Sequence, residues 1–90
     1  MFGINKQQAR SDEDLILLYK DTPDLKYFGE LYTRHTRLIA SIAYKYLNDA
    51  TETEDAVMDV FEILVEDLKT TEVKNFKPWL YSVTKNHALK

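Results

Sequence analysis

Residues 51–68 read TETEDAVMDVFEILVEDL, and this stretch decides the fold that we expect of the chain. Its apolar residues recur at steps of three and four, which is typical of a helix with one face against a core. They are Val57, Val60, Phe61, Leu64 and Leu68. An adjoining strip, here called the acidic strip, consists of Asp55, Asp59, Glu62 and Glu66. Because carboxylates at this spacing repel one another by roughly 0.2–0.5 kcal/mol per pair, the strip indicates a helix that meets a basic partner.

Two helices are expected before this stretch. The first spans Asp12–Lys20 and follows an S-x-x-D capping box that begins at Ser11. The second spans Asp24–Leu47, since Pro23 breaks the preceding helix and the apolar period then continues for more than twenty residues. Thr51, paired with Glu54 in a second capping box, is expected to begin the helix of residues 51–68.

The remaining chain predicts a loop and a last helix. Lys69–Lys74 has no period and is expected to be the loop, and Asn75 is expected to cap a helix that continues to Lys90. Residues 1–10 also lack an apolar period and predict a mobile N-terminal arm. Four helices with short connections indicate an all-α fold, a compact bundle of four helices that occupies residues 11–90.

Composition narrows the class of protein. Ninety residues are enough for one small core, and the absence of cysteine fits a reducing compartment, so a cytoplasmic location is expected. No apolar run resembles a secretory signal or a membrane span, and no membrane partner is expected. The net charge of −3 conceals a segregated layout: residues 1–10 carry +2, residues 11–68 carry −9 and residues 69–90 carry +4. An acidic body with a basic last quarter suggests two partners, or one acidic partner met by the last quarter alone.

The sequence offers little for catalysis. His35 and His87 lack a second histidine or a cysteine three or four residues away, so each is interpreted as a packed histidine rather than a base or metal ligand. A metal site of the bundle type needs Glu-x-x-His motifs, which are absent. We therefore expect no catalytic residue, no metal and no cofactor. An enzyme with His35 in its site is the minor alternative.

Binding is the stronger hypothesis, and it rests on residues 69–90, KTTEVKNFKPWLYSVTKNHALK. Lysines alternate there with Phe76, Trp79 and Tyr81, and this combination suits phosphate contact with base stacking. The same residues are also explained if the rings fill the core and the lysines face solvent. Both interpretations hold together if the rings point inward and the lysines outward.

Four segments in order resemble a known family. They are DEDLILLY from Asp12, YFGELYTRH from Tyr27, EDAVMDVF from Glu54 and NFKPWLYSVTKN from Asn75. The chain from about Asp12 to Lys90 is similar to region 2 of the extracytoplasmic-function sigma factors, which are part of the bacterial primary sigma family. The resemblance implies a non-catalytic domain that docks on RNA polymerase core and recognises and helps to melt the minus-ten promoter element.

The resemblance also implies residue roles. The helix with the acidic strip would contact the clamp coiled coil of the polymerase β′ subunit through Asp55, Met58, Asp59 and Glu62. The loop Lys69–Asn75 and the helix after it would read the non-template strand of promoter DNA, with one base flipped into a loop pocket. The residues implied for DNA are Lys69, Lys74, Asn75, Lys77, Ser82, Lys85 and Asn86. Phe76 and Trp79 would mainly hold the fold together.

Three positions depart from the family pattern. Met58 stands where glutamine is usual, Val65 where tryptophan is frequent and Ser82 where arginine is frequent. The departures at Met58 and Ser82 keep open an alternative, a degenerate sigma-like module that binds polymerase or an anti-sigma protein without reading DNA. The family's helix-turn-helix domain for the minus-thirty-five element is not in these ninety residues, so full promoter selection is not expected of this chain alone.

Overall fold

The computed structural model describes residues 10–90 and contains four helices. They are α2 (Asp12–Asp21), α3 (Leu25–Leu47), α4 (Ala50–Thr70) and α5 (Phe76–Ala88). No strand occurs in the described part, and the predicted all-α fold is confirmed. The arm expected over residues 1–10 lies, apart from Arg10, outside the described residues.

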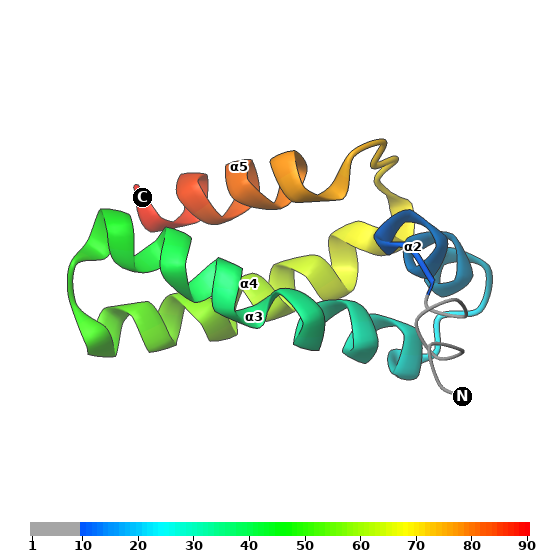
Figure 1. Ribbon diagram of the computed structural model, residues 1–90, viewed down its shortest axis with the longest axis horizontal. Coiled ribbons are helices and arrows are strands. Elements are labelled where there is room, and N and C mark those ends of the chain that lie inside the picture. Colours follow the sequence, from blue (N-terminus) through cyan, green and yellow to red (C-terminus); the bar gives the residue numbers. More distant parts are fainter. Residues whose placement is uncertain (1–9) are drawn as a thin grey trace, which may run out of the picture.

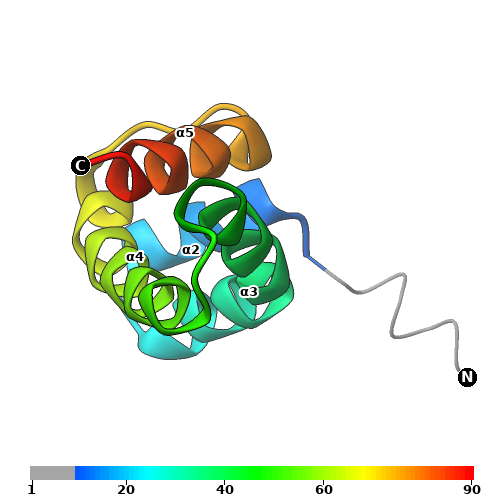
Figure 2. The same cartoon turned by 90° about the vertical axis from the view of Figure 1, so that its left-hand side faces the viewer.

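The two long helices α3 and α4 run antiparallel side by side, and α5 lies along both of them (Figure 1). The short helix α2 crosses the end of the bundle where α4 ends and α5 begins (Figure 1). Viewed along the bundle, α2 lies at the far end, behind the other helices (Figure 2), and it packs mainly against α3 and α4. This arrangement places α2 next to the connection between α4 and α5.

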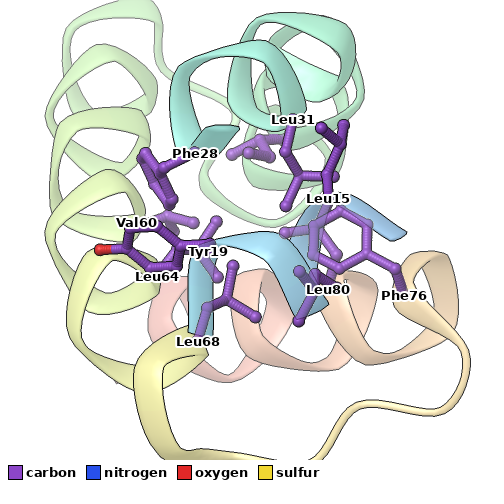
Figure 3. Close-up of a cluster of buried hydrophobic side chains, with 11 residues drawn as sticks. Leu15, Tyr19, Phe28, Leu31, Val60, Leu64, Leu68, Phe76 and Leu80 are labelled. Carbon is purple, nitrogen blue, oxygen red and sulfur yellow. The ribbon is translucent and has the colours of Figure 1, made fainter. Parts of the chain in front are cut away.

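The core lies where the four helices meet, with side chains from all four pointing toward one another (Figure 3). Of the apolar stripe expected on residues 51–68, Val60, Leu64 and Leu68 are buried as predicted. Val57 is half-buried, and Phe61 is 36% exposed although its ring packs at right angles to those of Phe28 and Tyr32. The buried hydrophobic residues of this cluster are Leu15, Ile16, Tyr19, Phe28, Leu31, Ile39, Val60, Leu64, Leu68, Phe76 and Leu80.

The start of α4 differs from the expectation. Asp49, not Thr51, is the N-cap residue, and its carboxylate accepts a hydrogen bond of 2.8 Å from the backbone N–H of Glu52. Asn48 ends α3 in the left-handed conformation, with φ of 52°. The left-handed turn at Asn48 ends α3, and the next residue, Asp49, has a side chain that can cap a new helix.

The last two helix ends also differ from the expectation. α4 continues through Lys69 to Thr70, so the loop consists of residues 71–75 rather than Lys69–Asn75. Lysine is favourable in a last turn because the carbonyl end of a helix is negative, and the buried Leu68 holds this turn against the core. α5 ends at Ala88 instead of continuing to Lys90, with the N–H of Leu89 bonded to the carbonyl of Lys85 at 3.0 Å.

Gly29 lies inside α3 and is expected to weaken it. A Cβ added at this position would meet no heavy atom within 4 Å beyond its chain neighbours and its own helix backbone. We expect Gly29→Ala to raise the free energy of unfolding by about 0.5–1 kcal/mol, because alanine has less backbone freedom to lose on folding. Urea denaturation measures the change. The reverse substitution in the same helix, Ala40→Gly, should lower stability, and an unchanged or lower value for Gly29→Ala would contradict the expectation.

Candidate functional site

The four residues expected to contact polymerase lie on the exposed side of α4. Asp55, Met58, Asp59 and Glu62 follow one another at steps of three, one and three, so they share one helical face. The Met58 side chain is 66% exposed. The face is thus acidic, with an apolar side chain in its middle.

Two residues of the acidic strip already have partners within the chain. The carboxylate of Asp59 lies 3.0 Å from Nε2 of His87 on α5, and the carboxylate of Glu66 lies 3.5 Å from Nζ of Lys69. Within residues 10–90, neither Asp55 nor Glu62 takes part in an ion pair. Asp55 and Glu62 therefore carry the uncompensated negative charge of this face.

The residues expected to contact DNA are divided between α4, the loop and α5. Lys69 lies in the last turn of α4, whereas Lys74 is exposed in the loop. Asn75 is the N-cap residue of α5, but its side chain makes no capping hydrogen bond, so its expected role as a side-chain cap is wrong.

The outer side of α5 brings together the other four residues expected at DNA. Lys77 and Lys85 are eight residues apart, with Tyr81 midway, so the three lie along one flank of the helix. Ser82 and Asn86 are four residues apart and occupy the neighbouring strip, where both are exposed. Lys77, Ser82 and Asn86 thus face outward and Lys85 is half-buried beside α3, while Phe76 and Leu80 point into the core.

An aromatic cluster joins the last turns of α3 to the middle of α5, and sequence analysis identified only part of it. The hydroxyl groups of Tyr46 and Tyr81 lie 2.8 Å apart, and Nζ of Lys45 lies 3.3 Å from the hydroxyl of Tyr81. Nζ of Lys85 lies 5.8 Å from the centre of the Tyr46 ring. Tyr81 and Lys85 were visible in the lysine and aromatic pattern, but Lys45 and Tyr46 join them only through the packing of α3 on α5.

This cluster changes the acidity of its members. The hydrogen bond between Tyr46 and Tyr81, followed by that from Lys45, lowers the pKa of Tyr81. The same hydrogen bond raises the pKa of Tyr46, and the bond to Tyr81 raises the pKa of Lys45. The ammonium group of Lys45 thus lies beside Tyr81 and adds positive charge to this part of the surface.

Side chains of α2 hold both ends of the loop between α4 and α5. A carboxylate oxygen of Glu13 accepts a hydrogen bond of 3.0 Å from the backbone N–H of Phe76, the first residue of α5. Nζ of Lys20 donates to the carbonyl oxygen of Thr71, the first residue of the loop. A cavity of about 400 Å³ lies between α2 and the loop. Its lining residues are Glu13, Ile16, Leu17, Lys20, Thr70, Glu72, Val73 and Lys74.

His35 is a packed histidine, as predicted. It is 5% exposed, and its ring lies 5.2 Å from that of Phe76. Its Nε2 is 2.9 Å from a carboxylate oxygen of Asp12, without the alignment of a hydrogen bond, and Arg34 bonds to the same oxygen at 3.0 Å. Among residues 10–90, no group of three or more histidine and acidic residues is placed to hold a metal ion. None of the described helices has the length and hydropathy to span a bilayer.

Comparison with known proteins agrees with this geometry. The family model for Sigma-70 region 2 matches residues 31–90, which comprise α3 from Leu31 onward, α4, the loop and α5. Searches of curated proteins and of solved structures gave no significant match. The matched segment includes the exposed face of α4 and the outer side of α5. The chain therefore belongs to the Sigma-70 region 2 family, the non-enzymatic domain with which sigma factors bind RNA polymerase and recognise promoters.

Proposed function

We propose that this chain docks on RNA polymerase core through α4 and reads the non-template strand of the minus-ten element through the loop and α5. The observation that carries this proposal is the separation of charge on two exposed surfaces. Uncompensated carboxylates lie on α4, whereas the ammonium groups of Lys77 and Lys85 lie on α5. Such a layout suits one basic protein partner and one nucleic acid. A cytoplasmic location is part of the proposal, because the polymerase acts there.

On the polymerase side, the proposed partner is the clamp coiled coil of the β′ subunit. Asp55 and Glu62 are free to pair with its basic side chains, and the exposed Met58 supplies apolar contact between them. Asp59 contributes while it is also in contact with His87. Charge would guide the encounter and fix the register, and the buried methionine would slow dissociation.

On the DNA side, Lys77 and Lys85 are proposed to contact phosphates, and Ser82 and Asn86 to donate hydrogen bonds to the strand. Lys69 and Lys74 add positive charge at the two ends of the loop region. Extruding one base from the stack costs a few kcal/mol, roughly, and contacts in a protein cavity offset it. The cavity beside the loop, with apolar and charged walls, supports placing the base there.

The net charge of −3 is unfavourable for DNA binding by the free chain. A negative protein with few lysines on one helix neutralises few phosphates, so its affinity for DNA alone should be low. We therefore propose that polymerase supplies the additional contacts, and that measurable DNA binding belongs to the complex of this chain with the core enzyme.

Reversing the charge of α5 tests the DNA-reading part of the proposal. We expect Lys77→Glu with Lys85→Glu to lower the binding of the polymerase complex to single-stranded minus-ten DNA by roughly tenfold, because two phosphate contacts are replaced by repulsion. Binding is measured on a pool of oligonucleotides with a randomised hexamer. Polymerase affinity of the variant should stay unchanged, since α5 lies outside the proposed docking face.

Lys26→Glu provides the matched control, because Lys26 is an exposed lysine on α3, away from α5. It should leave DNA binding as it is. If the α5 variant kept normal DNA binding and normal transcription, the alternative would hold, namely a module that binds polymerase or an anti-sigma protein without reading DNA.

A further inference from the structure

The loop of residues 71–75 is fixed at both ends by side chains of α2. Glu13 bonds to the N–H of Phe76 and Lys20 to the carbonyl of Thr71. These two residues are seven positions apart, which is about two helical turns, so they extend from the same face of α2. Within the described chain, the backbone groups of residues 72–74 form no hydrogen bond. The loop is therefore held by these two bonds to α2 and by the packing of Val73 against the core.

Glu13 caps the start of α5 in place of Asn75, the residue before the helix. The first N–H groups of a helix have no partner inside the helix, and a side chain at the N-cap usually accepts from them. Asn75 occupies this place but makes no such bond. The carboxylate of Glu13 accepts from Phe76 instead, and its negative charge is favourable at the positive end of α5. This hydrogen bond therefore ties the start of α5 to α2, alongside the packing of Phe76 in the core.

The cavity of about 400 Å³ takes one wall from α2 and the other from the end of α4 and the loop. Ile16 and Leu17 give the α2 wall an apolar surface, and Val73 lies opposite on the loop. Glu13 and Lys20 add one acceptor and one donor. Apolar side chains that contact a flat ring, with polar groups for its edge, are what an unpaired nucleobase requires.

We propose that α2 is a positioning element for base recognition. Glu13 and Lys20 hold the two ends of the loop and so set the width of the cavity, and Leu17 forms part of the surface against which the base rests. This inference rests on the proposed function, because it assumes that the loop meets single-stranded promoter DNA. It adds that the base preference depends on a helix that precedes the matched segment of the chain.

Paired substitutions separate this role from a merely structural one. Glu13→Ala and Lys20→Met remove the two bonds, whereas Glu13→Gln and Lys20→Arg keep an acceptor and a donor in the same places. Asp21→Ala is the matched control, because Asp21 is an exposed acidic residue of α2 that does not line the cavity. Each variant is combined with polymerase core and allowed to select from the randomised single-stranded pool, and the bound strands are sequenced. Polymerase affinity and thermal unfolding are measured in parallel.

We expect Glu13→Ala and Lys20→Met to reduce the preference at one base position by about fivefold or more, which is the discrimination that one base contact provides. Their polymerase affinity should match that of the parent chain. Glu13→Gln, Lys20→Arg and Asp21→Ala should select the parent sequence. If Glu13→Ala and Lys20→Met selected the parent sequence with unchanged preference at every position, α2 would have no role in base recognition.

Leu17→Trp tests the same proposal if loss of either hydrogen bond unfolds the domain. Leu17 is 64% exposed, so a larger side chain can be added there without disturbing the core. Tryptophan would fill the cavity, and we expect the base preference at the same position to be lost. An unchanged preference in this variant overturns the proposal. A different failure, in which the parent complex selects no sequence at all, overturns the proposed function itself.

Discussion

Replacing Phe28 with alanine is expected to lower the free energy of unfolding by about 3–5 kcal/mol. Phe28 is 2% exposed, and its ring lies 5.6 Å from Tyr19 on α2, 5.8 Å from Tyr32 on α3 and 5.2 Å from Phe61 on α4. Its removal leaves a cavity where three helices meet. Because a small domain is stable by only about 5–15 kcal/mol, a large share of the stability would be lost.

Urea denaturation measures this loss. Trp79 is the single tryptophan of the chain and lies next to the buried Phe76, with 6.1 Å between ring centres, so its fluorescence reports unfolding. Phe61→Ala is the matched control. The Phe61 side chain is 36% exposed, so removal of its ring should destabilise the domain less than removal of Phe28. Equal losses for both variants would show that Phe28 is not the centre of the aromatic group.

Reversing the charge of Asp55 and Glu62 together is expected to weaken binding to RNA polymerase core by roughly 30-fold or more. Removal of a charge from a desolvated pair typically costs about 2 kcal/mol or more, and reversal adds repulsion. The variant carries Asp55→Lys and Glu62→Lys. It should fold normally, because a lysine at position 62 lies four residues before Glu66 and relieves the repulsion of the acidic strip.

Titration of labelled chain with core polymerase, at two salt concentrations, measures the effect. The parent chain should lose affinity as the salt concentration rises, whereas the variant should depend on salt less. Asp21→Lys is the control, since it reverses an exposed charge on α2, away from this face. Unchanged affinity in the double variant would mean that α4 is not the docking helix.

The helices were predictable from the sequence because their apolar residues repeat over long distances. The twenty-three residues of α3 and the twenty-one of α4 contain enough turns for the period to be clear. Helix ends were less predictable because they depend on single residues. At the start of α4, both Asp49 with Glu52 and Thr51 with Glu54 fit the pattern of a capping box. The left-handed turn at Asn48 decides between them, and the sequence pattern does not reveal that turn.

In the candidate site, too, local patterns were predictable and contacts between helices were not. Spacing along one helix was enough to place Asp55, Asp59 and Glu62 on one strip, and the family resemblance added Met58. Contacts between helices could not be foreseen, because they depend on how α2 and α3 pack against α5. Glu13 and Phe76 are 63 positions apart, and Lys45 and Tyr81 are 36 apart, so no local pattern connects them. These long-range contacts determine the shape of the cavity and the charge of the surface beside α5.

The contact between Asp59 and His87 links α4 to α5, so its interaction energy depends on both helices. Asp59 belongs to the face proposed for polymerase, and His87 belongs to the helix proposed for DNA. A basic group that approaches Asp59 changes the charge that His87 faces, and a strand that shifts α5 moves His87 relative to Asp59. Linkage is reciprocal, so the factor by which polymerase changes DNA affinity through this pair equals the factor by which DNA changes polymerase affinity. If α4 and α5 bind as proposed, this contact would make the two binding equilibria of the domain depend on each other.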